Sequence, residues 1–389
     1  MRLRLAAPLL ASIALAGGAL SACGEVPMPS ASHTGSHTTT QHPISATTDA
    51  FPFVKGSTVI SLQGNSYQPH PPSGGGTDDY HCTLVNPHVT TDSFIVASHF
   101  YPNSLEVHHA ILFLIPPSLV ARAEAADHGG KGWTCFGETA LPGQGLGSLG
   151  DTPWLAAWAP GHGVSESPVG TGVTLPAGSL VVMQVHYNLL VGDAPVRVKL
   201  LLQTVPATRN LKQLNLALLP VPPDIPCPSG VTGPLCNRAA SLVDLGKRFG
   251  QQMVQFVNLL ENICGRNGFN PPAGDTTTCI FPAGFSGTIL AVTPHMHLLG
   301  AGMRIVLNPG TSQQQVLLND TNYNFDYQRS FPLAKPVTVV PSDKVQVTCT
   351  YNPRLRQELP QLRRLPARFV TWGDGSSDEM CLAIMAWVA

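Results

Sequence analysis

Short segments in which apolar and β-branched residues alternate recur along this chain, and they constrain its fold more than any other feature. The segments span residues 93–100, 107–114, 179–187, 196–203, 287–293, 344–351 and 381–388. Because successive side chains of a strand point to opposite faces, the segments predict strands with a buried face. The 37 Gly and 36 Pro residues are typical of the turns between them. The pattern predicts an all-β fold of β-sandwiches or jelly rolls.

The length of 389 residues predicts two such domains in tandem. We place the N-terminal jelly-roll domain at residues 51–207 and the C-terminal one at 208–389. One stretch departs from the strand pattern, because apolar residues recur at helical spacing over residues 241–263. It predicts a disulfide-stapled helical insertion at about residues 221–280. A net charge of -1 with 12% charged residues excludes a basic nucleic-acid binder.

The N-terminus has the features of an export signal. Arg2 and Arg4 precede an apolar stretch that is too short and wrongly flanked for a spanning helix, so residues 1–22 predict a signal peptide. Leu20-Ser-Ala-Cys23 is similar to the lipobox of bacterial lipoproteins, in which the cysteine is acylated. The alternative is an ordinary cleavage site with an incidental cysteine. We expect an exported chain, lipid-anchored through Cys23 to the membrane of the bacterial cell envelope, with residues 23–50 as a disordered Ser/Thr/His/Pro-rich tether.

Eight cysteines remain beyond Cys23: Cys82, Cys135, Cys227, Cys236, Cys264, Cys279, Cys349 and Cys381. An even number in an exported chain predicts four disulfides. Their proximity in the sequence favours Cys227 with Cys236 and Cys264 with Cys279, but spacing does not choose among the remaining pairings. If all eight are bridged, no thiolate remains to bind a metal or act as a nucleophile.

Three places concentrate potential metal ligands on predicted strands. His108 and His109 are adjacent, so both can bind one ion only if a bulge re-aims one of them; the alternative is one buried and one exposed histidine. His186 ends a hydrophobic strand, where a lone histidine is usually a hydrogen-bonded core residue. His295 and His297 share one face of a strand and can converge on one ion, or they are two unrelated surface histidines.

Five motifs occur in order along the chain: Tyr80-x-Cys82, His108-His109, Gln184-Val185-His186-Tyr187, His295-x-His297 and Asp378-Glu379-Met380-Cys381. Together they resemble the motifs of the copper type II, ascorbate-dependent monooxygenases. The resemblance extends from about Cys82 to the C-terminus, apart from the insertion. By itself Met380 would be interpreted as an ordinary residue of the hydrophobic core.

The resemblance implies two copper ions per chain, one in each jelly-roll domain. The first would be bound by His108, His109 and His186 and would take electrons from the reductant. The second, where oxygen and substrate meet, would have as its catalytic ligands His295, His297 and Met380. The resemblance also implies disulfides between Cys82 and Cys135 and between Cys349 and Cys381, which leaves the insertion cysteines to pair locally.

The donor set favours copper on chemical grounds. A thioether is a soft ligand that suits Cu(I), whereas zinc prefers other partners. A blue-copper site needs a free thiolate, and a zinc hydrolase is disfavoured because no His-Glu-x-x-His motif occurs. We name Gln184 and Tyr80 as candidates for hydrogen bonds to the imidazoles of the first site.

The resemblance implies a monooxygenase that hydroxylates a C–H bond of a small organic substrate. It would use O2, an external one-electron reductant such as ascorbate, and two separated mononuclear coppers. The alternative is a non-catalytic copper-binding or copper-delivery lipoprotein on the same fold. In peptide-amidating members an arginine and a tyrosine hold the peptide carboxylate, and here those positions are Thr293 and Ile384, which disfavours peptide amidation.

A basic stretch separates Cys349 from Met380. It either attracts an anionic substrate or reductant or is a solvated loop. Its members are Arg354, Arg356, Arg363, Arg364 and Arg368.

Overall fold

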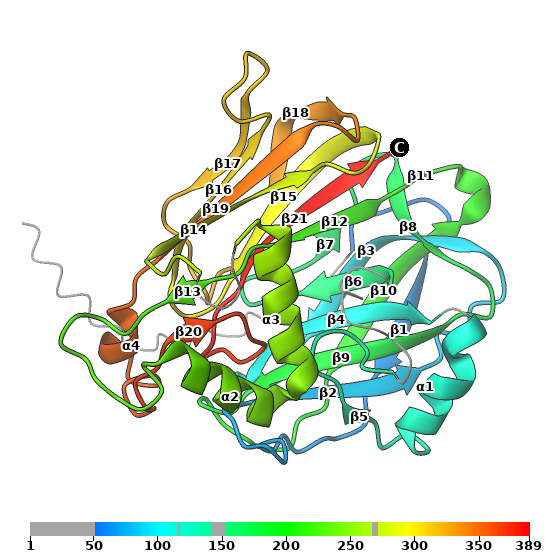
Figure 1. Cartoon of the computed structure of the whole chain (residues 1–389). Coiled ribbons are helices and arrows are strands. Elements are labelled where there is room, and N and C mark those ends of the chain that lie inside the picture. The colour runs from blue at the N-terminus through cyan, green and yellow to red at the C-terminus, as the bar shows by residue number, and fades with distance from the viewer. Residues whose placement is uncertain (1–50, 116, 142–151, 267–270) are drawn as a thin grey trace, which may run out of the picture. The chain divides into compact units, whose positions relative to one another are not determined.

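The computed structural model describes residues 51–115, 117–141, 152–266 and 271–389 (Figure 1). The predicted signal peptide, Cys23 and the tether up to residue 50 lie outside these residues. Among the helices of the described part of the chain, none is both long and apolar enough to cross a bilayer.

Residues 58–213 form two antiparallel sheets that pack face to face, apart from one parallel pair at an edge. The first has the strand order β1-β10-β3-β8-β11, with β7 added to β3, and the second has the order β5-β2-β9-β4-β6. Apolar side chains from both sheets form one core, as in a β-sandwich. The strands of the first sheet are β1 (Thr58–Gln63), β3 (Ser93–Tyr101), β7 (Ser165–Glu166), β8 (Thr171–Leu175), β10 (Lys199–Pro206) and β11 (Lys212–Gln213). Those of the second are β2 (Asp78–Val85), β4 (Val107–Ile115), β5 (Trp133–Thr134), β6 (Trp154–Trp158) and β9 (Leu180–Asn188). Short helices η1 (Pro117–Leu119), α1 (Val120–Asp127) and η2 (Ala207–Arg209) lie in the connections.

Residues 215–388 repeat this plan with two four-stranded sheets, β12-β21-β15-β18 and β14-β19-β16-β17. A second buried core lies between them. The strands of the first are β12 (Asn215–Pro220), β15 (Gly287–Met296), β18 (Phe331–Val339) and β21 (Cys381–Val388). Those of the second are β14 (Thr276–Pro282), β16 (Gly300–Leu307), β17 (Gln315–Asp320) and β19 (Lys344–Tyr351). A short pair, β13 (Asp224–Ile225) and β20 (Val370–Thr371), and helix α4 (Leu355–Glu358) complete this part.

The predicted all-β fold is confirmed, and all seven predicted segments are strands with small shifts at their ends. Strand β2 was not predicted. Its first residues include Asp78, Asp79 and His81, which interrupt any apolar alternation although all three are buried. Asp78 and Asp79 accept hydrogen bonds from residues outside β2, among them the amide of Ser376 and the hydroxyl of Tyr67, and the sequence pattern does not show these partners.

The predicted helical insertion is confirmed, but it consists of two helices, α2 (Arg238–Phe249) and α3 (Gln251–Ile263), which meet at an angle (Figure 1). The break is at Gly250, whose φ of 87° and ψ of 159° cannot continue a helix and are strained for other residues. At the start of α2, the side chain of Asn237 accepts a hydrogen bond from the amide of Ala240 (3.1 Å).

All four predicted disulfides are present. Cys227–Cys236 precedes α2, and Cys264–Cys279 follows α3 and joins it to β14. Cys82–Cys135 ties β2 to the segment after β5, and Cys349–Cys381 ties β19 to the start of β21. The last of these bonds fastens the residue directly after Met380.

Candidate metal centre

A bulge in strand β4 brings three imidazoles together. His109 lies opposite His186 of the neighbouring strand β9, and the register shifts between Val107 and His109, so His108 is the extra residue. This is the bulge that two adjacent histidines need in order to face one ion. The three Nδ1 atoms form a triangle: 3.1 Å between His108 and His186, and 3.2 Å for each of the other two pairs.

This triangle fits a metal ion. Nitrogen ligands about 2.0 Å from a shared ion in a tetrahedral arrangement lie roughly 3.3 Å apart. Burial, followed by the effect of the neighbouring imidazoles, lowers the pKa of both His108 and His109 well below the ordinary value. Both rings are therefore neutral at physiological pH, which is the form that binds metals.

Asp78 of β2 orients His186 from the side away from the triangle. Its Oδ1 lies 2.9 Å from Nε2 of His186 and also accepts the amide of Ser376 (2.8 Å), and its Oδ2 accepts the hydroxyl of Thr77 (2.7 Å). Burial raises the pKa of Asp78, but the hydrogen bond and charge of His186 outweigh it and hold this pKa below its ordinary value. A carboxylate in this position fixes which ring nitrogen of a histidine faces a metal.

The second predicted set lies where β15 and β21 pair. His295 is opposite Leu382 and Met296 is opposite Cys381, so Met380 comes next in register, beside His297. The buried carboxyl of Glu379 accepts the backbone amides of both His297 and Met380. This one side chain holds the backbone of two predicted ligands in place.

The imidazole of His297 is enclosed but unpaired. Both of its ring nitrogens are buried, and neither has a hydrogen-bond partner among the described residues, which is rare for buried polar atoms. His295 uses only its Nδ1, 2.7 Å from Oε1 of Gln328. Burial lowers the pKa of His295 to about 4 and that of His297 to about 3. Two neutral imidazoles with unused nitrogens, His297 buried and His295 half-buried, fit a metal ion.

The two histidine sets are neighbours. The ring centroids of His109 and His295 are 6.0 Å apart, and those of His108 and His297 are 6.3 Å apart. Gln328 reaches both sets, because its Nε2 lies 3.5 Å from Nε2 of His108. This proximity differs from the separated sites expected from the sequence, since strand patterns carry no information on the distance between residues of different sheets.

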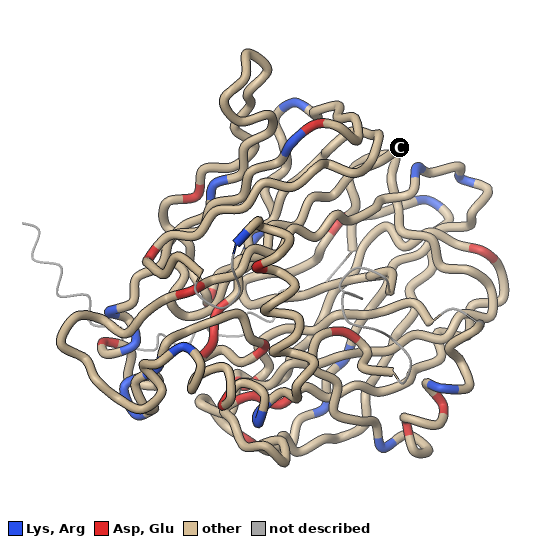
Figure 2. The backbone as a smooth tube through the Cα atoms, in the orientation of Figure 1, with Lys and Arg blue, Asp and Glu red and all other residues tan. Residues whose placement is uncertain are grey.

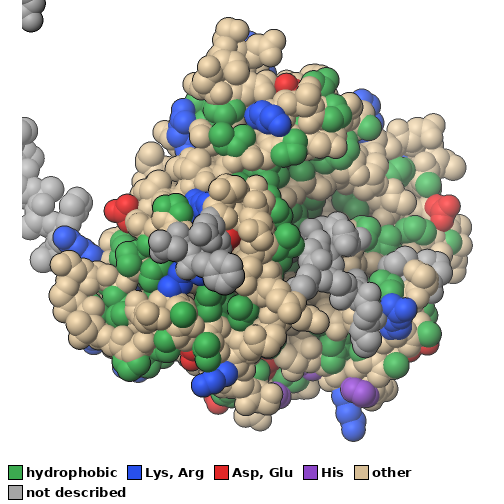
Figure 3. Space-filling view, in the orientation of Figure 1, with side chains coloured by type: hydrophobic (Ala, Val, Ile, Leu, Met, Phe, Trp, Pro, Cys, Tyr) green, Lys and Arg blue, Asp and Glu red, His purple; other side chains and the backbone are tan. Residues whose placement is uncertain are grey.

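A cavity of about 250 Å³ opens onto both sets. His109 of the first set and His295 and Met380 of the second line it, so the cavity borders one predicted ligand of the first set and two of the second. Thr293 and Ile384 also line it. In the space-filling view, hydrophobic side chains border the hollow beside α3 (Figure 3).

The residues that form hydrogen bonds with the imidazoles are not the two candidates named from the sequence. Gln184 donates to backbone carbonyls, including that of Cys135 (3.0 Å), and Tyr80 instead stacks on His186 with ring centroids 4.1 Å apart. Asp78 and Gln328 hold the rings. Asp78 could have been found, because it shares a strand face with Tyr80, whereas Gln328 lies in a loop with no recognisable signal.

The basic stretch before Met380 is in part structural. Arg356 is buried and donates to the carbonyl of Ser377 (2.9 Å), and Arg368 is buried between Asp244 (3.0 Å) and Asp378 (3.5 Å). Figure 2 shows this stretch as a group of basic positions near α4. These two arginines support the loop that leads to Met380, which argues against an anion-gathering role for them.

The fold and these imidazole sets define a β-sandwich protein with a candidate metal centre. Residues 274–388 match the family model described as "Copper type II ascorbate-dependent monooxygenase, C-terminal domain". This match, together with the relatives below, supports a relationship between the C-terminal part of the chain and the copper type II ascorbate-dependent monooxygenases.

Two relatives each match about a quarter of the chain. DBH-like monooxygenase protein 1 of Homo sapiens is 29% identical over 100 residues, which are 25% of this chain and 14% of that protein. DBH-like monooxygenase protein 2 of Mus musculus is 32% identical over 95 residues, or 24% of this chain and 14% of that protein. The similarity thus covers a small part of each relative. Among solved structures, allantoicase aligns over 83% of this chain and 81% of its own at 11% identity, but its TM-score of 0.20 carries no argument.

Proposed function

We propose that this chain is a copper-dependent monooxygenase that hydroxylates a C–H bond of a small organic molecule with O2 and a one-electron reductant such as ascorbate. The proposal rests on one observation. Two sets of predicted ligands, one of three histidines and one of two histidines and a methionine, lie at the same cavity. His108, His109 and His186 would hold one copper ion. His295, His297 and Met380 would hold the other.

Copper, when bound, supplies dioxygen activation and single-electron transfer. The chain supplies the geometry. Asp78 and Gln328 orient the imidazoles, Glu379 holds the backbone of His297 and Met380, and the apolar cavity limits water around the substrate. The short distance between the two sets would hold two bound copper ions close to one another.

The alternative is a copper-binding or copper-delivery protein that does not turn over. The cavity beside His295 and Met380 favours the enzyme, because copper storage needs no chamber for an organic molecule. Two ligand sets of different softness are also unnecessary for storage.

Oxygen uptake by the copper-loaded chain tests the proposal. We expect two copper ions per chain and, with ascorbate and a panel of small organic molecules, oxygen consumption that depends on the substrate and yields a hydroxylated product. Two bound coppers without substrate-dependent oxygen uptake across the panel would favour the copper-delivery alternative.

We also propose that the chain is exported and anchored to the cell envelope through an acylated Cys23. The proposal rests on the leader sequence. Mass spectrometry of the mature chain should find a lipid-modified N-terminal cysteine, and Cys23→Ser should release the chain from the membrane fraction. An unmodified mature N-terminus at another residue would contradict the anchor.

A further inference from the structure

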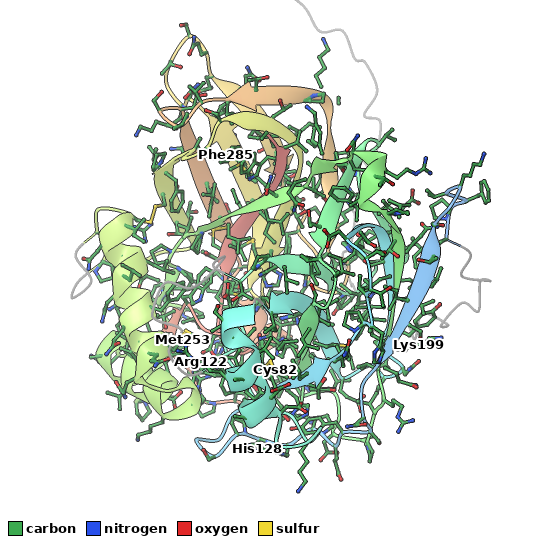
Figure 4. The ribbon with its side chains drawn as sticks, turned by 90° about the vertical axis from the view of Figure 1, so that its right-hand side faces the viewer. Cys82, Arg122, His128, Lys199, Met253 and Phe285 are labelled. Atoms are coloured by element: carbon green, nitrogen blue, oxygen red, sulfur yellow. A yellow bond between two sulfur atoms is a disulfide. The ribbon has the colours of Figure 1, made fainter. Side chains whose placement is uncertain are left out.

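The helical insertion forms one wall of the cavity beside the predicted oxygen site. Phe249, Met253 and Phe256 line the cavity from α2 and α3, and Trp154 and Trp158 line it from β6. In Figure 4 Met253 is labelled on the side of the helices that faces the body of the molecule. Both helices precede residues 274–388, the part matched by the family model.

The lining is mainly apolar and rich in rings. Its Phe, Tyr and Trp members are Tyr80, Phe136, Trp154, Trp158, Phe249, Phe256 and Trp372. They support one another, since Phe136 meets Phe249 edge-on at 4.8 Å between centroids and Phe256 meets Trp372 at 5.8 Å. Such walls favour a flat, apolar molecule, because aromatic pairs prefer edge-to-face and offset-stacked contacts.

The described lining offers little to pair with a formal charge. Its side chains include no Lys or Arg, and Thr293 and Ile384, which also line it, are uncharged. Of its two acidic residues, Asp374 already accepts the amide of Gly137 (2.6 Å), and burial raises the pKa of Asp374 to about 7. Glu138 is also buried. Burying an unpaired charge is unfavourable, so an uncharged ligand is favoured over an anion or an ammonium ion.

We propose that the insertion makes this cavity a binding site for a neutral aromatic molecule whose ring packs between α3 and β6, beside His295 and Met380. The inference rests on the proposed function and names its substrate class. The volume of the cavity agrees with such a ligand, because a cavity of roughly 150 Å³ holds benzene. A cavity of about 250 Å³ therefore admits one ring with a short side chain.

Three probes of similar shape and different charge test the proposal at pH 7: 2-phenylethanol, 2-phenylethylamine and phenylacetate. Their binding to the intact, copper-loaded chain is measured by tryptophan fluorescence, to which Trp154, Trp158 and Trp372 contribute from the cavity wall. We expect the alcohol to bind at least tenfold more tightly than the amine or the acid. Equal affinities, tighter binding of a charged probe, or no binding of the alcohol would overturn the proposal.

Variants of α3 test the role of the insertion. Gln252 is exposed and lines the cavity, so Gln252→Lys places a cation at its edge without disturbing the core. We expect phenylacetate to bind at least fivefold more tightly to this variant, and Phe256→Leu to weaken the binding of the alcohol at least threefold. Val243→Ala, an exposed change on α2 away from the cavity lining, is the matched control. Unchanged affinities in both α3 variants would show that the insertion does not border the ligand.

The binding experiment and the oxygen-uptake experiment can fail independently of each other. Selective binding of the alcohol without substrate-dependent oxygen uptake would contradict the proposed function and leave the site standing. Oxygen uptake with a charged substrate, unaffected by Gln252→Lys and Phe256→Leu, would support the function and refute the inference.

Discussion

Asp78 and His186 lie 2.9 Å apart, Oδ1 to Nε2, and both side chains are buried. The same carboxylate oxygen accepts the amide of Ser376, which lies in the loop leading to Met380. One side chain of β2 therefore links the three-histidine set to the loop that carries the thioether. The two predicted metal sites share their supporting residues as well as their cavity.

Asp78→Asn should weaken copper binding at the three-histidine set by about 10–100-fold, because the variant loses the charge that orients His186. A competition titration with a copper chelator measures the change. Asp193→Asn, at an exposed position, is the control and should bind copper like the parent. Parent-like affinity in Asp78→Asn would show that the contact does not support the metal.

Met380→Ala should abolish hydroxylation, and His295→Ala should do the same while reducing bound copper from two ions to one. Both variants should leave the first two sheets folded, because neither residue belongs to them. Copper analysis, oxygen uptake and circular dichroism give the three readouts. The buried core residue Met385 of β21 provides a control, since Met385→Leu nearly conserves volume and should retain turnover. Normal turnover in Met380→Ala would rule out the proposed oxygen site.

Glu379→Ala should destabilise the fold by about 1–3 kcal/mol for each of the two buried amides left without an acceptor. Burial raises the pKa of Glu379 well above its ordinary value. Glu379→Gln keeps an acceptor oxygen without charge and should lose much less stability. Urea unfolding measures both variants, and equal losses would contradict a role as amide acceptor.

Acid should destabilise the metal-free chain in part through His81. Burial lowers the pKa of His81 to about 4, and its ring stacks on Tyr67 at 3.6 Å between centroids. The unfolded chain, with an ordinary histidine pKa near 6.5, binds this proton first, so stability falls as the pH drops from about 6.5 to about 4.

His81→Phe retains a stacked ring. Unfolding of this variant should take up fewer protons in that pH window, by up to one per chain, so its unfolding free energy should depend less steeply on pH. Denaturant unfolding at several pH values measures the slope, with His88→Phe at an exposed position as the control. An unchanged slope in His81→Phe would contradict the assignment.

Local periodicity was enough to predict seven of the strands, because alternation reflects which face of a strand is buried. It also located the insertion, but a single helical pattern did not show the break at Gly250, which depends on the backbone conformation of one glycine. Proximity in sequence suggested the two disulfides of the insertion. The other two pairings were implied only by the family resemblance, since Cys82 and Cys135 are 53 residues apart.

The amino-acid sequence by itself determined which residues can bind a metal: paired histidines, a histidine ending a strand and a methionine opening one. Tertiary structure alone decided how they meet. The bulge at His108, the packing of sheets that places His109 6.0 Å from His295, and the contacts of Asp78 and Gln328 all join residues from distant parts of the chain. Periodicity records burial within one element, whereas these relationships arise from the packing of separate elements against one another, which no local pattern encodes.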